Sequence, residues 1–146
     1  MKQKLKWLAL SILPLILGCI YSMCIESMTV SMYWVINIVF FALWMLLSYL
    51  LADKTTPPKV QASWMCRITF VALVLILYQE LLQGHYWSGY LGVATQYYFL
   101  PGLTLSAGAV GALLPIGAMW LACIAEAAAM FFLSLLAARL KVKRSV

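Results

Sequence analysis

Four long apolar segments limit what this chain can fold into. They cover residues of about 7–24, 30–51, 64–83 and 114–138. A helix needs about 20 mostly apolar residues to cross a bilayer, and each segment is close to that length. Of all residues, 66% are apolar and 10% are charged, whereas a soluble domain has about 45–50% and 25%. We therefore predict an all-α fold: an integral membrane four-helix transmembrane bundle that forms a single domain over residues 1–146.

All ten lysines and arginines lie in segments that four spans would bring to the same side of the membrane. They are Lys2, Lys4, Lys6, Lys54, Lys59, Arg67, Arg139, Lys141, Lys143 and Arg144. The segments 25–29 and 84–110 contain none of them. Basic loops are retained in the cytoplasm. We therefore predict a multi-pass protein of the plasma membrane, of bacterial origin, with both termini cytoplasmic. A three-span fold would divide the basic residues between the two sides, and a fifth span would place the last cluster outside.

The segment 84–110 is rich in aromatic residues and glycine and has no charge apart from His85. Tyrosine and tryptophan favour the boundary between membrane and water. We predict a long outer loop here, which lies on the membrane or dips into it. The apolar part, about 103–110, is expected to form a short interfacial helix.

The first 19 residues also have the form of a signal peptide, with a basic start and a short apolar stretch. Gly18 and Cys19 resemble the end of a bacterial lipobox, and cleavage there would leave Cys19 lipidated. The apolar stretch continues beyond Cys19 and three more spans follow. An uncleaved first helix is therefore the preferred interpretation.

Two of the four acidic residues, Glu80 and Glu126, lie within predicted spans. Glu80 is thirteen residues after Arg67, and Glu126 is thirteen before Arg139. Both would thus lie about 20 Å from the basic side, at one level, with no basic partner there. We expect the two carboxyl groups to hold protons, and to share one if their helices pack together. This pattern is typical of a proton relay or a cation site, but a protonated glutamate can also simply hold helices together.

Polar residues next to Glu80 are predicted to form a wet cap at the outer end of the third span. They are Gln79, Gln83 and His85. His85 could accept a proton at this outer mouth. Its alternative role is a plain polar anchor at the interface.

Small residues recur along one side of the fourth span. Ala118, Ala122, Ala125 and Ala129 follow the spacing i, i+4, i+7 and i+11, which lets another helix approach closely. Glu126 is four residues after Ala122, so we expect it to face protein rather than lipid. This face is the predicted helix-packing surface.

The sequence contains no strong catalytic or metal-binding motif. The four cysteines form no CxxC pair, and no HExxH motif or phosphate-binding loop is present. We therefore predict no catalytic residues, no metal and no cofactor, and regard enzyme activity as uncertain. The formal net charge of +6 flanks apolar segments, so it indicates orientation in a membrane rather than a nucleic-acid partner.

These features predict first a small membrane subunit or interaction protein that acts through helix contacts, forming homo-oligomers or joining a larger membrane partner. The alternative is a proton- or cation-coupled carrier of a small solute that uses Glu80 and Glu126. A second alternative is a lipid-processing enzyme with Glu80 and His85 at the outer interface. The lipid bilayer is a partner in each case, and the basic inner face could also attract anionic lipid.

Overall fold

The computed structural model describes residues 2–113 and 119–143, which form helices joined by short turns, with no strand in these ranges. The predicted all-α class is confirmed. The elements are α1 (Lys2–Leu10), α2 (Leu13–Cys24), η1 (Ile25–Ser27), α3 (Val30–Leu51), α4 (Pro58–Met65), α5 (Arg67–Leu77), η2 (Tyr78–Gln83), α6 (Tyr90–Leu113) and α7 (Met119–Lys143).

Three helices are long and apolar enough to cross a membrane, and a bent pair provides a fourth candidate. The three are Lys2–Ser27, Val30–Leu51 and Met119–Lys143. The pair Pro58–Met65 and Arg67–Gln83 is bent by 53°. By length and composition, these four agree with the four predicted spans. Residues 114–118, predicted to begin the fourth span, lie outside the described residues.

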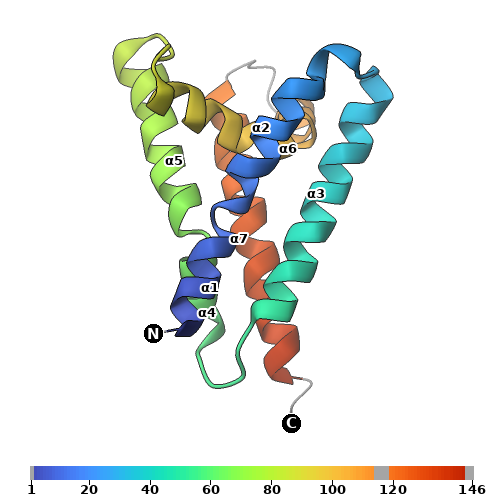
Figure 1. The fold of residues 1–146 in the computed structure, drawn as a ribbon, viewed down its shortest axis with the longest axis vertical. Coiled ribbons are helices and arrows are strands. Elements are labelled where there is room, and N and C mark those ends of the chain that lie inside the picture. The colour runs from blue at the N-terminus through green and yellow to red at the C-terminus, as the bar shows by residue number, and fades with distance from the viewer. Residues whose placement is uncertain (1, 114–118, 144–146) are drawn as a thin grey trace.

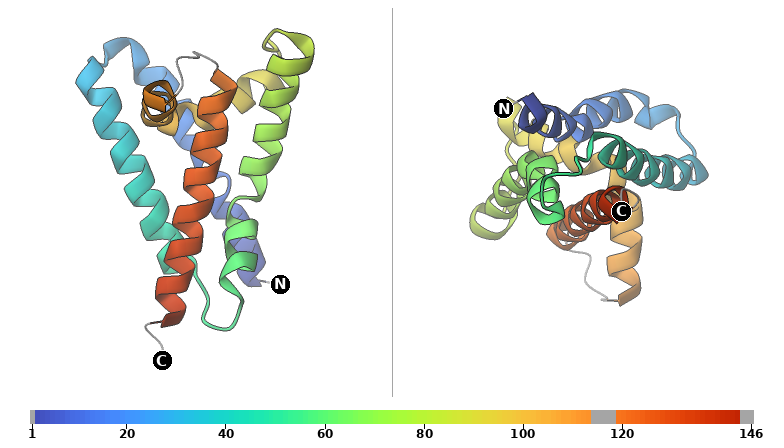
Figure 2. Two further views of the ribbon diagram at one scale, coloured as in Figure 1. Left: turned by 180° about the vertical axis from the view of Figure 1, so that it is seen from behind. Right: turned by 90° about the horizontal axis from the view of Figure 1, so that it is seen from below.

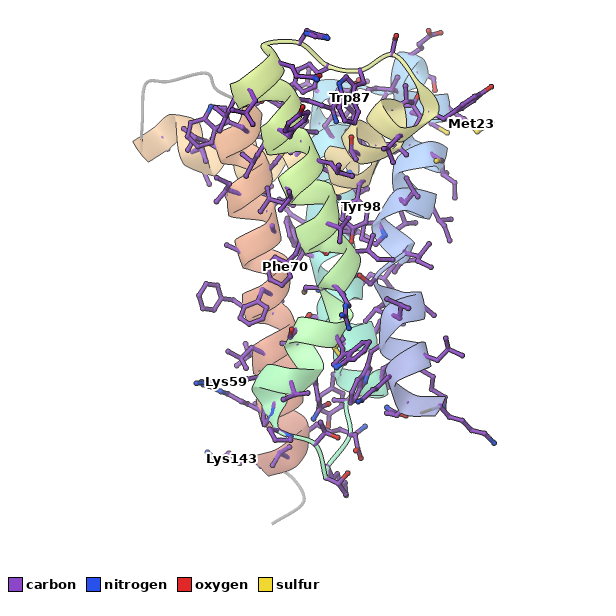
Figure 3. The ribbon with its side chains drawn as sticks, turned by 90° about the vertical axis from the view of Figure 1, so that its left-hand side faces the viewer. Met23, Lys59, Phe70, Trp87, Tyr98 and Lys143 are labelled. Carbon is purple, nitrogen blue, oxygen red and sulfur yellow. The ribbon has the colours of Figure 1, made fainter. Side chains whose placement is uncertain are left out.

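The helices form a V in which α7 runs through the middle (Figure 1). Lys2 and Lys143, the first and last described residues, lie at one end together with the 52–57 loop. We call this the basic end because α1, this loop and the last turns of α7 carry lysines and arginines. The 84–89 loop and the first turn of α7 lie at the opposite, aromatic end. Figure 2 shows the same arrangement from behind and from below, and Lys59 and Trp87 mark the two ends in Figure 3.

Two helix breaks meet in the middle of the bundle. Pro14 lies in the first turn of α2, where it cannot donate a backbone hydrogen bond, so the preceding helix ends at Leu10. The second break lies at Cys66, between α4 and α5. The backbone N–H of Ile68 donates to Oγ of Ser11 (2.8 Å). The first break therefore supplies a hydrogen-bond acceptor for a backbone donor of the second.

Helix α6 differs from the loop predicted for 84–110. It is a single 24-residue helix that contains Pro101 and crosses the bundle near the aromatic end (Figure 1). Pro101 removes the N–H that would pair with the Tyr97 carbonyl, and this carbonyl lies against Gly18 of α2, where a Cβ atom would overlap it. Close packing against α2 thus stabilises α6 as a helix, although its proline and glycines favour a loop.

Two apolar clusters form the core. Towards the basic end, Trp7, Leu10, Phe40, Trp44, Met65, Cys66 and Met130 pack together. Towards the aromatic end, the cluster consists of Ala72, Ile76, Tyr98, Phe99, Cys123 and Ala127. The candidate site lies beside this second cluster.

Candidate functional site

The buried face of α7 carries the site. Ala122 and Glu126 are both buried on it, at 2% and 0% exposure, as their spacing predicted. Ala125 and Ala129 are half-buried and line an open groove of about 430 Å³ beside α3 and α6. Ala118 lies outside the described residues. The predicted alanine face therefore divides into a part that packs inside the bundle and a part that borders a groove.

Gly102 of α6 makes room for the Glu126 carboxyl group. An ideal Cβ atom on Gly102 would lie 2.5 Å from Oε1, 2.6 Å from Cδ and 3.0 Å from Cγ of Glu126. Gly102 follows Pro101 in the chain, and the carboxyl group lies against the backbone of Gly102. No residue with a side chain could occupy this position without moving the glutamate.

Neither carboxyl oxygen of Glu126 makes a hydrogen bond of normal geometry with a described residue, although the group lies against the Gly102 backbone. A buried carboxyl group without a partner is costly whether it is charged or neutral. The described lysines and arginines lie at the basic end, so none of them is a partner for this carboxyl group. A proton donor or cation that entered here would therefore gain a partner that the protein itself does not supply.

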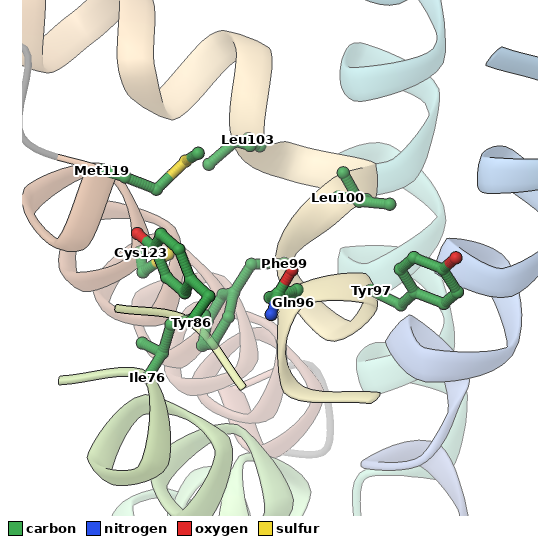
Figure 4. A pocket seen from close by; sticks show the side chains of 9 residues that line it. All are labelled: Ile76, Tyr86, Gln96, Tyr97, Phe99, Leu100, Leu103, Met119 and Cys123. Carbon is green, nitrogen blue, oxygen red and sulfur yellow. The ribbon is translucent and has the colours of Figure 1, made fainter. Parts of the chain in front are cut away.

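A cavity of about 190 Å³ (Figure 4) is lined by Cys123, which lies one turn before Glu126 in α7, whereas Glu126 itself is not among the lining residues. Its lining comes from α5, the 84–89 loop, α6 and α7: Ile76, Tyr86, Gln96, Tyr97, Phe99, Leu100, Leu103, Met119 and Cys123. Helical side chains lean towards the N-terminus of their helix. Glu126 therefore leans towards Cys123, one turn earlier, which lines the cavity. Gly102, against the carboxyl group, directly precedes the lining residue Leu103.

Glu80 lies elsewhere, near the mouth of the site. It is half-buried in η2, and its Oε2 accepts a hydrogen bond from the hydroxyl of Tyr86 (2.7 Å). Burial raises the pKa of Tyr86 above its ordinary value of 10.0, and the hydrogen bond to Glu80 raises it further. Glu80 and Glu126 are not hydrogen-bonded to each other, but both lie close enough to Cys123 to interact electrostatically with its thiol.

Gln79 holds the aromatic end together. It is fully buried; its Nε2 donates to Oγ1 of Thr95 (2.9 Å), and its Oε1 accepts from the backbone N–H of Trp87 (2.9 Å). The π-helical winding of η2 is the kind of irregularity that often marks a functional segment. Gln79 thus has a clear structural role, as the anchor of the 84–89 loop and of α6.

Gln83 and His85 lie on the exposed surface of the same end. The side-chain oxygen Oε1 of Gln83 accepts a hydrogen bond from the indole N–H of Trp87. His85 Nδ1 lies 2.9 Å from the backbone oxygen of Gln83. His85 therefore contacts the residues just before it in the chain, and it makes no hydrogen bond to Glu80.

Two polar residues near the site, Tyr98 and Asn37, were not predicted from the sequence. Tyr98 lies next to Thr69 (2.7 Å between hydroxyl oxygens) and donates to the Ser11 backbone oxygen (2.9 Å). Asn37 accepts a hydrogen bond from the backbone N–H of Leu105 (3.0 Å). A lone asparagine inside an apolar span is itself a signal, whereas Tyr98 was hidden among the aromatic residues of its segment.

The described residues contain no cluster of three or more His, Cys, Asp or Glu side chains that could hold a metal ion. All four cysteines are free thiols, with Cys19 and Cys24 exposed and Cys66 and Cys123 buried. Comparisons of the chain with protein-family models, with curated proteins and with solved structures found no match. The chemistry of the site therefore rests on its own residues, among which Glu126 is the central one.

Proposed function

We propose that the protein is a multi-pass protein of the plasma membrane that carries a small cationic solute in exchange for protons at Glu126. The observation that carries this proposal is the fully buried Glu126 carboxyl group, which has no hydrogen-bond partner among the described residues. Intramembrane carboxylates of this kind usually mark ion or proton pathways. The proposed orientation has both termini in the cytoplasm, because the basic residues gather at the end that carries them.

Exchange follows from the isolation of this carboxyl group. Without a solute, Glu126 holds a proton, because an unpaired charge is too costly in a buried site. When a cation moves from the cavity to the carboxyl group of Glu126, the ionised carboxylate gains a partner, and the proton is released. The two states are mutually exclusive, so movement of the solute is coupled to movement of a proton in the opposite direction.

The cavity indicates the class of solute. The rings of Phe99 and Tyr86 can contact a cation through their faces, and Met119 and Cys123 add polarizable sulfur atoms. In Figure 4 the ring of Tyr97 points away from this group, towards α2. The aromatic end has Glu26 and Glu80 and no lysine or arginine, so its field attracts cations. A small organic ammonium ion with an apolar body fits these properties.

The test uses protein in liposomes with a trapped pH indicator and benzyltrimethylammonium, a permanently charged probe that cannot cross as a neutral amine. The wild-type protein should couple probe uptake to proton release, and Glu126→Gln should abolish the coupling. Glu26→Gln, which removes an exposed carboxylate at the same end, is the matched control and should retain it. Proton-coupled flux that survives in the Glu126→Gln, Glu80→Gln double variant would refute the proposal.

A second candidate is a membrane subunit that acts through helix contacts with itself or with a larger membrane protein. The supporting observation is the apolar groove bordered by Ala125 and Ala129, with Ala109 and Ser106 on the α6 side. Small residues on both walls would let a partner helix approach closely. Ala129→Leu should then dissociate the complex, whereas Ala42→Leu, on an exposed part of α3, should not. A strictly monomeric protein that crosslinks to nothing in native membranes would argue against this role.

A further inference from the structure

Two cations of the basic end share one aromatic ring. Nζ of Lys4, in α1, lies 5.3 Å from the ring centroid of Trp64, and Cζ of Arg67, in α5, lies 4.4 Å from it. The sum of these distances, 9.7 Å, is the largest separation that the two charges can have. The fold thus brings two residues that are 63 positions apart in the chain to the same tryptophan ring.

The ring between them is held in place. Trp64 is half-buried and packs against the cluster that contains Trp7 and Met65. The indole N–H of Trp7 donates to the Leu51 backbone oxygen (2.9 Å), and Gln3 donates to the same oxygen (2.6 Å). α1 is therefore tied to the end of α3, and Lys4 is presented from a fixed backbone. Both Lys4 and Arg67 remain exposed.

No acidic side chain in the described residues forms an ion pair with either cation. Asp53, the acidic residue of the basic end, accepts hydrogen bonds from the hydroxyls of Thr55 (2.5 Å) and Thr56 (3.0 Å). These bonds, that from Thr55 above all, hold the pKa of Asp53 below its ordinary value, against a smaller effect of burial. Asp53 is thus engaged within its own loop, and Lys4 and Arg67, whose charged groups are at most 9.7 Å apart, have no acidic partner among the described residues.

We infer that Lys4, Arg67 and Trp64 bind the phosphodiester group of an anionic phospholipid headgroup. An arginine offers paired donors and a lysine a point charge to phosphate oxygens, and tryptophan favours the depth at which headgroups lie. The inference relies on the membrane orientation given under the proposed function, but not on transport at Glu126. The inference assigns the lipid to one place on the basic surface, whereas a general attraction to anionic lipid would involve every exposed lysine.

The test measures binding of phosphatidylglycerol and phosphatidylcholine to the purified full-length protein by native mass spectrometry. The wild-type protein should prefer phosphatidylglycerol, and Lys4→Gln with Arg67→Gln should reduce its binding about 5- to 25-fold. The matched control, Lys54→Gln with Lys59→Gln, removes two exposed charges from the same end and should change binding less than twofold. The charge-preserving pair Lys4→Arg with Arg67→Lys should retain binding, which would show that positive charge at these two positions is what binding requires, and an unchanged unfolding temperature of the Gln pair in detergent would exclude a folding defect.

Equal losses in the Gln pair and in the matched control would overturn the site, because they would show a general charge effect. Displacement of phosphatidylglycerol by inorganic phosphate at equal concentration would overturn the lipid assignment in favour of a free anion. The Glu126→Gln variant should bind phosphatidylglycerol normally. Failure of the transport proposal is thereby distinguishable from failure of this one.

Discussion

Gly102 of α6 lies directly against the carboxyl group of Glu126 of α7, so that an added Cβ atom would be 2.5 Å from Oε1. This contact joins the one helix that crosses the bundle to the helix that runs through its centre. It also explains why a buried carboxyl group with no hydrogen-bond partner can be accommodated at all. The neighbouring backbone has no side chain at this point.

The first prediction concerns this contact. Gly102→Ala should lower the free energy of unfolding by about 1–3 kcal/mol, because the new methyl group must displace the Glu126 side chain. Gly111, in the same helix, has open space at its Cβ position. Gly111→Ala is therefore the control, and should stabilise the protein by up to about 1 kcal/mol through helix propensity. Unfolding of both variants in mixed detergent, followed by tryptophan fluorescence, compares them; equal stability would show that the two helices do not meet here.

The second prediction concerns Gln79. Gln79→Leu leaves the Trp87 backbone N–H without its acceptor, which costs about 1–3 kcal/mol for a buried donor. The Thr95 hydroxyl loses a donor but keeps its hydrogen bond to the Gly92 backbone oxygen (2.7 Å). Hydrogen exchange at residues 84–89 should become faster. Gln83→Leu removes an exposed acceptor of the same size and should have a smaller effect on exchange. A loop that stays equally protected in both variants would contradict the role of Gln79 as its anchor.

The third prediction concerns pH. The pKa of Tyr86 is raised above 10.0, first by burial and then by the hydrogen bond to Glu80. The folded state therefore holds this proton more tightly than the unfolded chain does. Its contribution to stability is fully present below pH 10 and is lost as the pH rises through the folded-state pKa. The difference in phenolate absorbance between the wild type and Tyr86→Phe should appear only well above pH 10.

Glu80→Gln provides the control for this titration. It should lower the pKa of Tyr86 only in part, since burial is the larger cause and remains in the variant. A Tyr86 that titrates at its ordinary pKa in the wild-type protein would contradict both the burial of this side chain and its hydrogen bond to Glu80.

The fourth prediction concerns Tyr98, which is 2% exposed. Tyr98→Phe removes the hydroxyl that joins α6 to Thr69 and to Ser11 at the helix breaks. Two lost hydrogen bonds should destabilise the protein by about 1–3 kcal/mol. Tyr90→Phe, at a position that is 99% exposed, should change stability by less than about 0.5 kcal/mol. Thermal unfolding in one detergent would measure both.

Much of the architecture could be predicted from local pattern. The segment 30–51 coincides with α3, because a long apolar run without proline has few alternatives to helix. The burial of Glu126 beside Ala122 followed from the helical period alone. The prediction for 84–110 was wrong in extent: it expected a loop, but most of the segment belongs to α6. Glycine and proline indicate a loop only where tertiary packing does not stabilise a helix. Here the backbone at Tyr97 of α6 packs closely against Gly18 of α2, which stabilises the helix.

The sequence by itself determined the helical class, the four candidate spans and the confinement of basic residues to the segments that flank these spans, because hydropathy and charge are properties of short segments. Only the tertiary structure decided where each carboxyl group lies. Glu80 and Glu126 are equally distant from the basic residues in sequence, yet one bonds Tyr86 near the surface and the other is enclosed against Gly102. The reason is that α6, which the local pattern did not reveal as one helix, crosses the bundle between other helices and encloses Glu126.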